Sequence, residues 1–419
     1  MYRTKKNIVF YGITTVLTFF IIYQSNLSFL GLPPALHSNR VASVLLVLYA
    51  LLNYKVYWPT ELTRRTIEGR TFAKMVKLYL VFALYSFILY VIQGPGTGNH
   101  SFIALVNFFI ITIPIIWAYS ILFDSIDSFM RVLLYVGVLQ SVVIVIGQVS
   151  PAFVLFLDAT FNQKTDVYSE YLFTDLMNNY AGGIACITSQ GVIRFVTALI
   201  ASSYLYIKYD KLKYLLIFIV FAIISSMIAR TGLILDLVCF VCILVSKIYN
   251  KNFVGIIGFI SVLGIALLLF SNEVDNNGLF WKERYKRYDT LKEDRGAVFF
   301  TDYFQGERTE YPSIEDNLFV GVGVFSGCSA GGEIVNVDGG FLRTYSAFGL
   351  FPALLFYGAL FAIMYSIYKT QKQWSNRILV LMIMLSVTVG EFKEFFIMTY
   401  WPMTFLIVSS VLISKSKKY

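Results

Sequence analysis

Long apolar runs, separated by short charged stretches, limit what this chain can fold into. Each run is roughly 16 to 22 residues long, the length that a helix needs to cross the hydrocarbon of a bilayer. Lipid offers the backbone no hydrogen-bond partners, so a crossing segment must satisfy its own N–H and C=O groups, as a helix does. The runs do not alternate polar and apolar residues as the strands of a transmembrane barrel do. The sequence therefore predicts an all-α, polytopic membrane protein.

The composition excludes a soluble globular protein. Of the 419 residues, 57% are hydrophobic and 14% are charged, whereas a soluble domain carries about 25% charged residues. The formal net charge is +9, but the basic residues fall between the apolar runs and not on one soluble face, so we expect no nucleic-acid partner. Arg3, Lys5 and Lys6 precede the first run without a small-residue cleavage site after it, which predicts a retained helix rather than a signal peptide.

About twelve spanning helices are expected within a single transmembrane domain over residues 1–419. Every short loop on one side of these helices carries lysine or arginine, and the positive-inside rule makes that side cytoplasmic. Both termini then lie in the cytoplasm, and the long segment 271–340, between the ninth and tenth helices, is an external loop. The expected helices cover residues 8–23, 41–54, 78–92, 102–123, 131–147, 191–207, 214 to about 225, 231–246, 253–270, 341–365, 378–390 and 395–413.

One arginine interrupts the apolar pattern where the chain reverses direction. Arg230 lies in the stretch Ser225–Ile234, between the seventh and eighth predicted helices. An arginine in mid-bilayer costs roughly 2.5 to 3.5 kcal/mol on insertion scales, so this position indicates a functional site unless the side chain merely extends to the headgroups. Both interpretations stay open from the residue alone. The predicted topology places Arg230 at the outer face.

Two more arginines, Arg194 and Arg343, lie at predicted helix ends on the outer side. Together with Arg230 they favour an anionic ligand, because the planar guanidinium matches phosphate oxygens and its charge-assisted bonds strengthen where water is scarce. Further basic residues occur in the long external loop. There the sequence from Trp281 to Tyr288 fits a mixed-charge helix lying on the membrane surface better than a ligand site.

Three carboxylates on the same side are candidates for acid–base chemistry. Asp338 and Glu391 are suited to take a proton from a hydroxyl group as general bases. Glu391 and Glu394 also flank Lys393, so a surface ion network is the alternative for that pair. For Asp338, which precedes Gly339, Gly340 and the tenth predicted helix, that alternative is not favoured.

Metal and cofactor chemistry finds little support in the sequence. His37 and His100 stand in separate loops, and neither has a His or Cys partner at ligand spacing. Cys239 and Cys242 form a C-x-x-C pattern inside an apolar helix, where packing is the expected role. No phosphate-binding P-loop or G-x-S-x-G elbow occurs, so no nucleotide or other cofactor is expected. The remaining cysteines fall in predicted external loops, where a disulfide between them stays open: Cys186 and Cys328.

Two parts of the chain resemble the bacterial O-antigen polymerase and ligase superfamily of polytopic glycosyltransferases. Residues 226–233, Ser-Met-Ile-Ala-Arg-Thr-Gly-Leu, are similar to its Ser-Arg-Thr-Gly stretch at an outer turn, with Ala229 in place of the usual serine. Residues 317–323, 338–342 and 346–351 are similar to its closing pattern, in which a Gly-x-Gly turn precedes a polar residue, an aromatic–Leu pair and a helical glycine. The order of these stretches and the late external loop match the family as well.

The resemblance implies transfer of a glycan from an undecaprenyl-diphosphate-linked donor to a sugar hydroxyl of a lipid-linked acceptor, without metal or nucleotide. The reaction would take place on the outer face of the inner membrane and build O-antigen, capsule or exopolysaccharide. Arg230 would hold the diphosphate, with Arg194 and Arg343 as helpers chosen by predicted position. Preorganised arginines can meet the charge that develops on the leaving diphosphate. The implied partners are the lipid-linked oligosaccharides and membrane lipid, with a chain-length regulator as a further candidate.

The polymerase branch of this family is favoured over the ligase branch. Ligases place a histidine in the late external loop, whereas no histidine lies beyond His100 here, and Asp338 could stand at the corresponding place. A flippase for lipid-linked oligosaccharides is a further alternative, but it needs charges across the bilayer centre, where Asp236 is the main example. For Asp236 a structural role, paired with a nearby arginine, is the simpler expectation.

Overall fold

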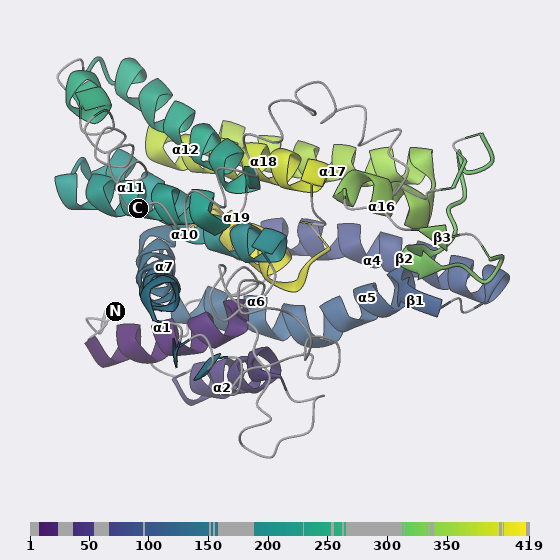
Figure 1. The fold of residues 1–419 in the computed structure, drawn as a ribbon. Helices are drawn as coiled ribbons and strands as arrows, with labels where there is room; N and C mark the ends of the chain where they lie inside the picture. The colour runs from purple at the N-terminus through teal and green to yellow at the C-terminus, as the bar shows by residue number, and fades with distance from the viewer. Residues whose placement is uncertain are drawn as a thin grey trace, which may run out of the picture.

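The computed structural model describes residues 8–23, 37–53, 67–94, 97–150, 152–153, 156–157, 188–228, 230–252, 255–261, 264, 312–313, 315–332, 334–335, 339–393, 396 and 398–415. Most of them belong to helices that pack side by side in one bundle (Figure 1). In chain order these are α1 (Ile8–Ile22), α2 (Ser38–Leu52), α4 (Ile67–Gln93), α5 (Ser101–Asn107), the π-helical turn η2 (Phe108–Thr112), α6 (Ile113–Leu122), α7 (Ile126–Val149), α10 (Thr188–Tyr209), α11 (Leu212–Ile228), α12 (Arg230–Tyr249), α16 (Gly340–Phe348), α17 (Leu350–Thr370), α18 (Trp374–Lys393) and α19 (Tyr400–Lys415).

Within the described residues, 7 helical segments are long and apolar enough to cross a membrane. They are α4, the continuous run of α5, η2 and α6, and then α7, α10, α12, α17 and α18, while α1, α2 and α11 are shorter apolar helices. The expectation of an all-α membrane protein is confirmed in outline. The total of about twelve spans and the external loop 271–340 stay predictions, because residues 265–311 lie outside the described part of the chain.

Two helices differ from the sequence-based expectation. α4 begins at Ile67 rather than near residue 78, so its first turns include Arg70 and Lys74, which the sequence placed in the loop before the third predicted helix. Hydropathy marks the part of a helix that lies in lipid, not the turns that extend beyond it. The tenth predicted helix, residues 341–365, is in fact two helices, α16 and α17, which meet at Gly349.

α19 is the central helix of the bundle. Every residue from Trp401 to Ser414 is buried, so the helix is enclosed on all sides. A helix without a polar face requires such surroundings. Three of its hydroxyl side chains, those of Thr404, Ser410 and Ser414, donate to carbonyls of the same helix, as Ser410 Oγ does to Leu406 at 2.7 Å. Figure 1 shows α19 in the middle of the molecule, among the other helices.

Several helices that carry a lysine in the last turn end on the same side of the bundle. We call this side the lysine end. Lys415 Nζ at the end of α19 donates hydrogen bonds to the carbonyls of Ser120 and Phe123, where α6 ends, at 3.2 and 3.0 Å. A cation at a helix C-terminus is stabilised by the helix dipole. Four helices that end on this side, α10, α12, α17 and α19, each have a lysine in the last turn: Lys208, Lys247, Lys369 and Lys415.

Side-chain contacts hold the helices together at the lysine end. Asp127, in the first turn of α7, accepts hydrogen bonds from Lys208 Nζ at 2.6 Å and from the Tyr204 hydroxyl at 2.7 Å. The same hydroxyl oxygen lies 3.0 Å from Asn376 Oδ1 of α18. These contacts fix α7, α10 and α18 relative to one another.

The opposite side, hereafter the sheet end, carries a three-stranded antiparallel sheet in the order β1–β2–β3 (Figure 1). β1 (Thr97–His100) lies in the turn predicted after α4, and β2 (Val324–Cys328) and β3 (Ile334–Val335) lie in the predicted external loop. Asn99 pairs with Ser326, and the register then shifts. The sheet thus ties the turn between α4 and α5 to the chain that precedes α16.

The break at Gly349 is closed by the segment 317–323. Gly349 has a φ of +92°, a conformation that residues with a Cβ rarely adopt. The backbone N–H of Leu350, at the start of α17, donates to the Asn317 carbonyl at 3.0 Å. A Cβ added to Gly321 would lie 2.5 Å from the Gly349 nitrogen, so the two backbones touch. Close packing of the chain on itself therefore explains why glycine occupies positions 321 and 349.

We predict that Gly349→Ala destabilises the protein by about 1–3 kcal/mol, because alanine strains this backbone conformation. Gly358→Ala, in the adjoining helix α17, is the matched control, since a Cβ there meets nothing within 4 Å; it should be neutral or stabilise by about 0.4–1 kcal/mol. The thermal midpoint of the purified protein in detergent measures both changes. Equal midpoints for the two variants would contradict the role of the break.

Candidate functional site at the sheet end

A fully buried carboxylate lies at the sheet end. Glu391, in the last turn of α18, has 0% of its surface exposed. Its Oε2 accepts a hydrogen bond of 2.7 Å from the Tyr357 hydroxyl of α17, and that hydroxyl lies 2.9 Å from Thr344 Oγ1 of α16. Burying a carboxylate is costly unless donors satisfy it. The tyrosine is such a donor, so one polar chain links three helices.

The break at Gly349 brings this chain of side chains together. Thr344 and Tyr357 are separated by 13 residues, which in one continuous helix would place them roughly 20 Å apart. Their hydroxyl groups meet only because α16 folds back against α17 at the break. The backbone geometry of Gly349 therefore positions the partner of Glu391.

Aromatic rings surround the carboxylate and reach the surface. Tyr79 of α4 is fully buried and interacts electrostatically with Glu391. The ring of Phe341 in α16 lies 4.7 Å from the Tyr357 ring and 5.1 Å from that of Phe392. Phe392 is 46% exposed. The cluster thus leads from the buried carboxylate to the exterior of the bundle.

Arg343 directly precedes Thr344 in α16, and its side chain is half-buried. Its backbone N–H donates to the Gly339 carbonyl at 3.0 Å, which closes the first turn of the helix. The predicted outer arginine and the hydroxyl that bonds Tyr357 are therefore neighbours on one short helix. Of the predicted arginines, Arg343 is the one that the structure connects most directly to Glu391.

Arg194 is held in the second turn of α10. Its carbonyl accepts a hydrogen bond of 2.8 Å from Thr197 Oγ1, which in turn accepts one of 3.2 Å from Trp401 Nε1 of α19. Arg194 also interacts electrostatically with Tyr23, the buried residue that follows α1. Arg194 is thus fixed between α1, α10 and α19.

Arg230 is the first residue of α12, and the structure describes its backbone but not its side chain. α12 and α18 pack against each other, and at the lysine end the rings of Tyr249 and Trp374 stack at 3.8 Å. Counted from that contact, Arg230 lies roughly 28 Å along α12 and Glu391 roughly 26 Å along α18. The two residues are therefore at the same level of the bundle.

Gly232, two residues after Arg230, lies where α11 and α12 approach each other closely. A Cβ on Gly232 would lie 2.3 Å from the carbonyl oxygen of Ser225 in α11. Four residues further, Asp236 forms a side-chain hydrogen bond with the same serine, and its Oδ1 has no hydrogen-bond partner within the described part of the chain. A serine of the neighbouring helix is thus its described partner, and the expected pairing with an arginine stays a prediction.

Two helices that carry predicted arginines, α10 and α12, begin at the sheet end, and the short helix α16, which carries the third, lies there against α17. α10, α12 and α16 have Arg194, Arg230 and Arg343 within their first two turns. The N-terminus of a helix has a partial positive charge and N–H groups free to bind an anion. Added to the arginines, this makes the sheet end suited to an anionic ligand beside the buried carboxylate Glu391.

Other predicted residues carry less information. Asp338 and Glu394 lie outside the described residues, as do Cys186 and the side chain of Lys393. Cys328, in β2, is a free thiol.

The two histidines lie apart, one before α2 and one in β1. Burial lowers the pKa of His37, and the nearby charge of Arg40 lowers it further. His100 is buried, and its ring meets the edge of Tyr90 at 5.7 Å. In the part of the chain that the structure describes, no three His, Cys, Asp or Glu side chains come close enough to hold a metal ion.

The sequence did not single out Tyr357, Thr344 or Tyr79. A tyrosine inside an apolar helix indicates a buried hydrogen-bond partner, and that signal was present at Tyr357. The identity of the partner depends on the fold of α16 against α17, which follows from Gly349 and not from residue spacing.

Comparison with models of known protein families gives no match, and comparison with curated proteins gives none either. The fold and the site therefore define a class and not a family. The chain is a helical membrane protein with a buried, tyrosine-bonded carboxylate and arginine-bearing helix starts at one end.

We predict that Tyr357→Phe destabilises the protein by about 1–3 kcal/mol, because Glu391 loses a hydrogen-bond donor in a buried position. Tyr365→Phe is the matched control on the same helix, because that tyrosine is half-exposed; it should change stability by less than about 0.5 kcal/mol. Thermal midpoints in detergent provide the measurement. When Tyr357→Phe is combined with Glu391→Gln, the double variant should lose less stability than the two single variants lose in sum. Strict additivity of the two losses would argue against the hydrogen bond between these residues.

Proposed function

We propose that this chain is a polysaccharide repeat-unit polymerase. It transfers a glycan from an undecaprenyl-diphosphate-linked donor to a sugar hydroxyl of a lipid-linked acceptor. One observation carries the proposal: the helices that bear Arg194 and Arg230 begin, and the short helix that bears Arg343 lies, at the end of the bundle where Glu391 is buried against Tyr357. The resemblance of residues 226–233 and 317–351 to the O-antigen polymerase and ligase superfamily supports the same activity.

In this proposal the lysine end faces the cytoplasm and the sheet end faces the periplasm. The lysines in the last turns of α10, α12, α17 and α19 support this orientation, because cytoplasmic loops are enriched in lysine and arginine. α1 starts at this end, since the ring of Phe10 lies 5.7 Å from that of Phe123. Both termini would then be cytoplasmic, and the site would open towards the periplasm.

The arginines bind the leaving group in this mechanism. The acceptor oxygen bonds to the anomeric carbon of the donor sugar as the bond from that carbon to the phosphate oxygen breaks. Undecaprenyl diphosphate departs with the electron pair, and guanidinium groups fixed before the reaction stabilise its charge. Arg230 has the primary role by the matched stretch, and Arg194 and Arg343 assist from α10 and α16.

A carboxylate receives the proton of the acceptor hydroxyl. Glu391 has no exposed surface, so a proton would reach it through the Tyr357 hydroxyl, which bridges it to Thr344. Asp338 is the second candidate for the base, supported by its place in the family-like pattern. Tyr357 is a positioning residue in either case, because it holds the Glu391 carboxylate in one orientation.

The arginine assignment is tested by measuring glycan chain length in cells in which each variant replaces the wild-type chain. Arg230→Ala and Arg343→Ala should each lower the amount of long-chain polymer by about 100-fold, the typical effect of removing one fixed donor from a transition-state charge. Arg343→Lys should recover only part of the activity, because lysine lacks the planar fork. Long-chain polymer at wild-type level, with normal protein abundance, would contradict the assignment.

Lys372→Ala is the matched control for these variants. Lys372 is exposed in the turn between α17 and α18 at the lysine end, so its loss should leave chain length unchanged. Deletion of the chain separates the alternatives. Single repeat units on the final acceptor indicate a polymerase, accumulated lipid-linked polymer indicates a ligase, and repeat units retained on the cytoplasmic side indicate a flippase.

A further inference from the structure

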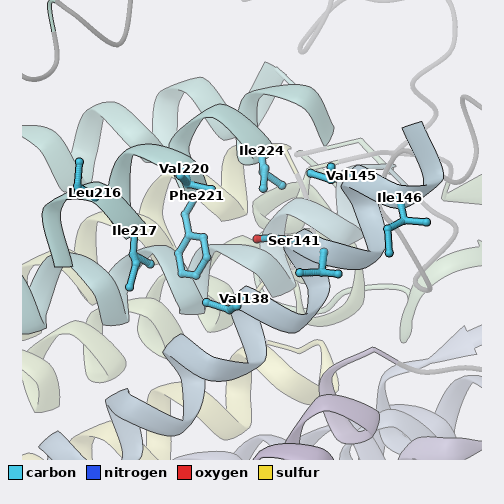
Figure 2. Close-up of a pocket in the computed structure, with 10 residues that line it drawn as sticks. Val138, Ser141, Val145, Ile146, Leu216, Ile217, Val220, Phe221 and Ile224 are labelled. Carbon is cyan, nitrogen blue, oxygen red and sulfur yellow. The ribbon is translucent and has the colours of Figure 1, made fainter. Parts of the chain in front are cut away.

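An apolar groove of about 380 Å³ lies between α7 and α11 (Figure 2). Its only polar lining residue is Ser141, whose hydroxyl is already bonded to the Gly137 carbonyl at 2.7 Å. The groove can therefore contact hydrocarbon chains, but its lining has no free hydrogen-bonding group for a polar ligand. Its walls are formed chiefly by Val138, Val142 and Ile146 of α7 and by Leu216, Val220 and Ile224 of α11.

The groove faces outward and is closed towards the interior. Val142 and Val220, on opposite walls, are each about half exposed. At the floor a Cβ on Gly137 would lie 2.7 Å from the Phe221 ring, so no space leads inward. In a membrane such a groove opens to lipid chains.

Each wall of the groove continues towards the lysine end into a basic residue. On α7, Arg131 precedes Val138 and Val142 on one helical stripe, since residues three, four or seven apart share a face. On α11, Lys213 precedes Leu216 and Val220 in the same way. Both basic residues thus lie on the groove side of their helices.

Two tyrosines join these basic residues into one rim. The guanidinium carbon of Arg131 lies 5.6 Å from the centre of the Tyr209 ring. Tyr209 lies 6.1 Å from Tyr214, and Lys213 Nζ lies 5.0 Å from the centre of the Tyr214 ring. A continuous surface of two cations and two aromatic rings borders the groove at this end.

The rim keeps a net positive charge. The nearby carboxylate, Asp127, is paired with Lys208 at 2.6 Å and accepts a further bond from the Tyr209 hydroxyl at 2.7 Å. Arg131 donates only to that hydroxyl, at 3.4 Å, and its buried Nε has no partner among the described residues. Within that same set neither Arg131 nor Lys213 forms an ion pair. An anion is therefore the missing partner of the rim.

We propose that the groove and rim together bind an anionic phospholipid from the leaflet at the lysine end. Its phosphate lies between Arg131 and Lys213, and one acyl chain lies in the groove. The rise from Arg131 to Val142 is roughly 16 Å, which matches the about 15 Å of hydrocarbon in one leaflet. The site is separate from the proposed polymerase site and does not depend on that function.

A lipid entering from the sheet end fits less well. There the described residues on the two stripes are apolar, and they include Val145 and Val149 of α7 and Ile228 of α11. Arg194 of α10 interacts with Tyr23 beyond α1 and belongs to the interior of the bundle, and the side chain of Arg230, two residues after Ile228, lies outside the described part of the chain. Among the described side chains, the positive charge that adjoins the groove therefore lies at the lysine end.

The test uses the full chain in phosphatidylcholine nanodiscs with traces of a phosphatidylglycerol that carries a photoreactive group near the end of its acyl chain. We expect crosslinks in peptides covering residues 138–146 and 216–224. Replacing Arg131 and Lys213 by glutamine should lower this labelling about fivefold for each residue, and roughly 25-fold together. Val220→Trp should also lower it by filling the groove, while Lys372→Gln should leave it unchanged.

Three results would overturn the proposal. One is equal labelling of these peptides by a phosphatidylcholine probe of the same chain. Another is unchanged labelling in the double variant while it remains monodisperse in size-exclusion chromatography. The third is displacement of the probe by undecaprenyl diphosphate but not by excess phosphatidylglycerol, which would assign the groove to the polymerase donor.

Discussion

The interruption between α16 and α17 is the constraint on which the sheet end depends. Backbone groups at a helix break have no water to bond with when the break lies in or near hydrocarbon. The segment 317–323 supplies the missing partners, with the Asn317 carbonyl accepting from the first N–H of α17. Gly321 and Gly349 permit this because the two backbones touch. With the break closed, α16 can lie against α17 and present Thr344 and Arg343 at the end of α18.

The two ends of the bundle differ in their chemistry as a result of helix direction. Helices that end at one side bring lysines there, and helices that begin at the other side bring arginines and positive dipole ends. The lysine end is held by ion pairs and tyrosine bonds centred on Asp127. At the sheet end the carboxylate of Glu391 is buried instead, and the helices there bear the half-buried Arg194 and Arg343. This asymmetry supports a role for the sheet end in binding the lipid diphosphate.

Hydropathy was sufficient to predict the class of fold and most helix positions. α10 and α18, for example, begin and end within a few residues of the predicted bounds, because length and apolar content decide a spanning helix. It could not predict the break at Gly349, since a single glycine inside an apolar run also occurs in unbroken helices, as Gly358 does in α17. The strand β1 was hidden for a similar reason: its pairing with β2 joins residues 97–100 to 324–328.

The candidate site could be predicted only in part. The arginines and Glu391 stand out because charges near hydrocarbon are rare, and the structure places their helix ends on one side of the bundle. Tyr357 does not stand out, because its role depends on a contact between two helices separated by the break. Gly232, two residues after Arg230, has a structural role, since it lets α12 approach Ser225 of α11.

The central claim is that the sheet end binds a lipid diphosphate through its arginines. A structure of the chain with undecaprenyl diphosphate, determined by electron cryomicroscopy in nanodiscs, tests it most directly. The account predicts phosphate density within hydrogen-bonding distance of guanidinium groups from α12 and α16, on the side where Glu391 ends α18. Diphosphate density at the lysine end, or at the sheet end without contact to any of the three arginines, would contradict it.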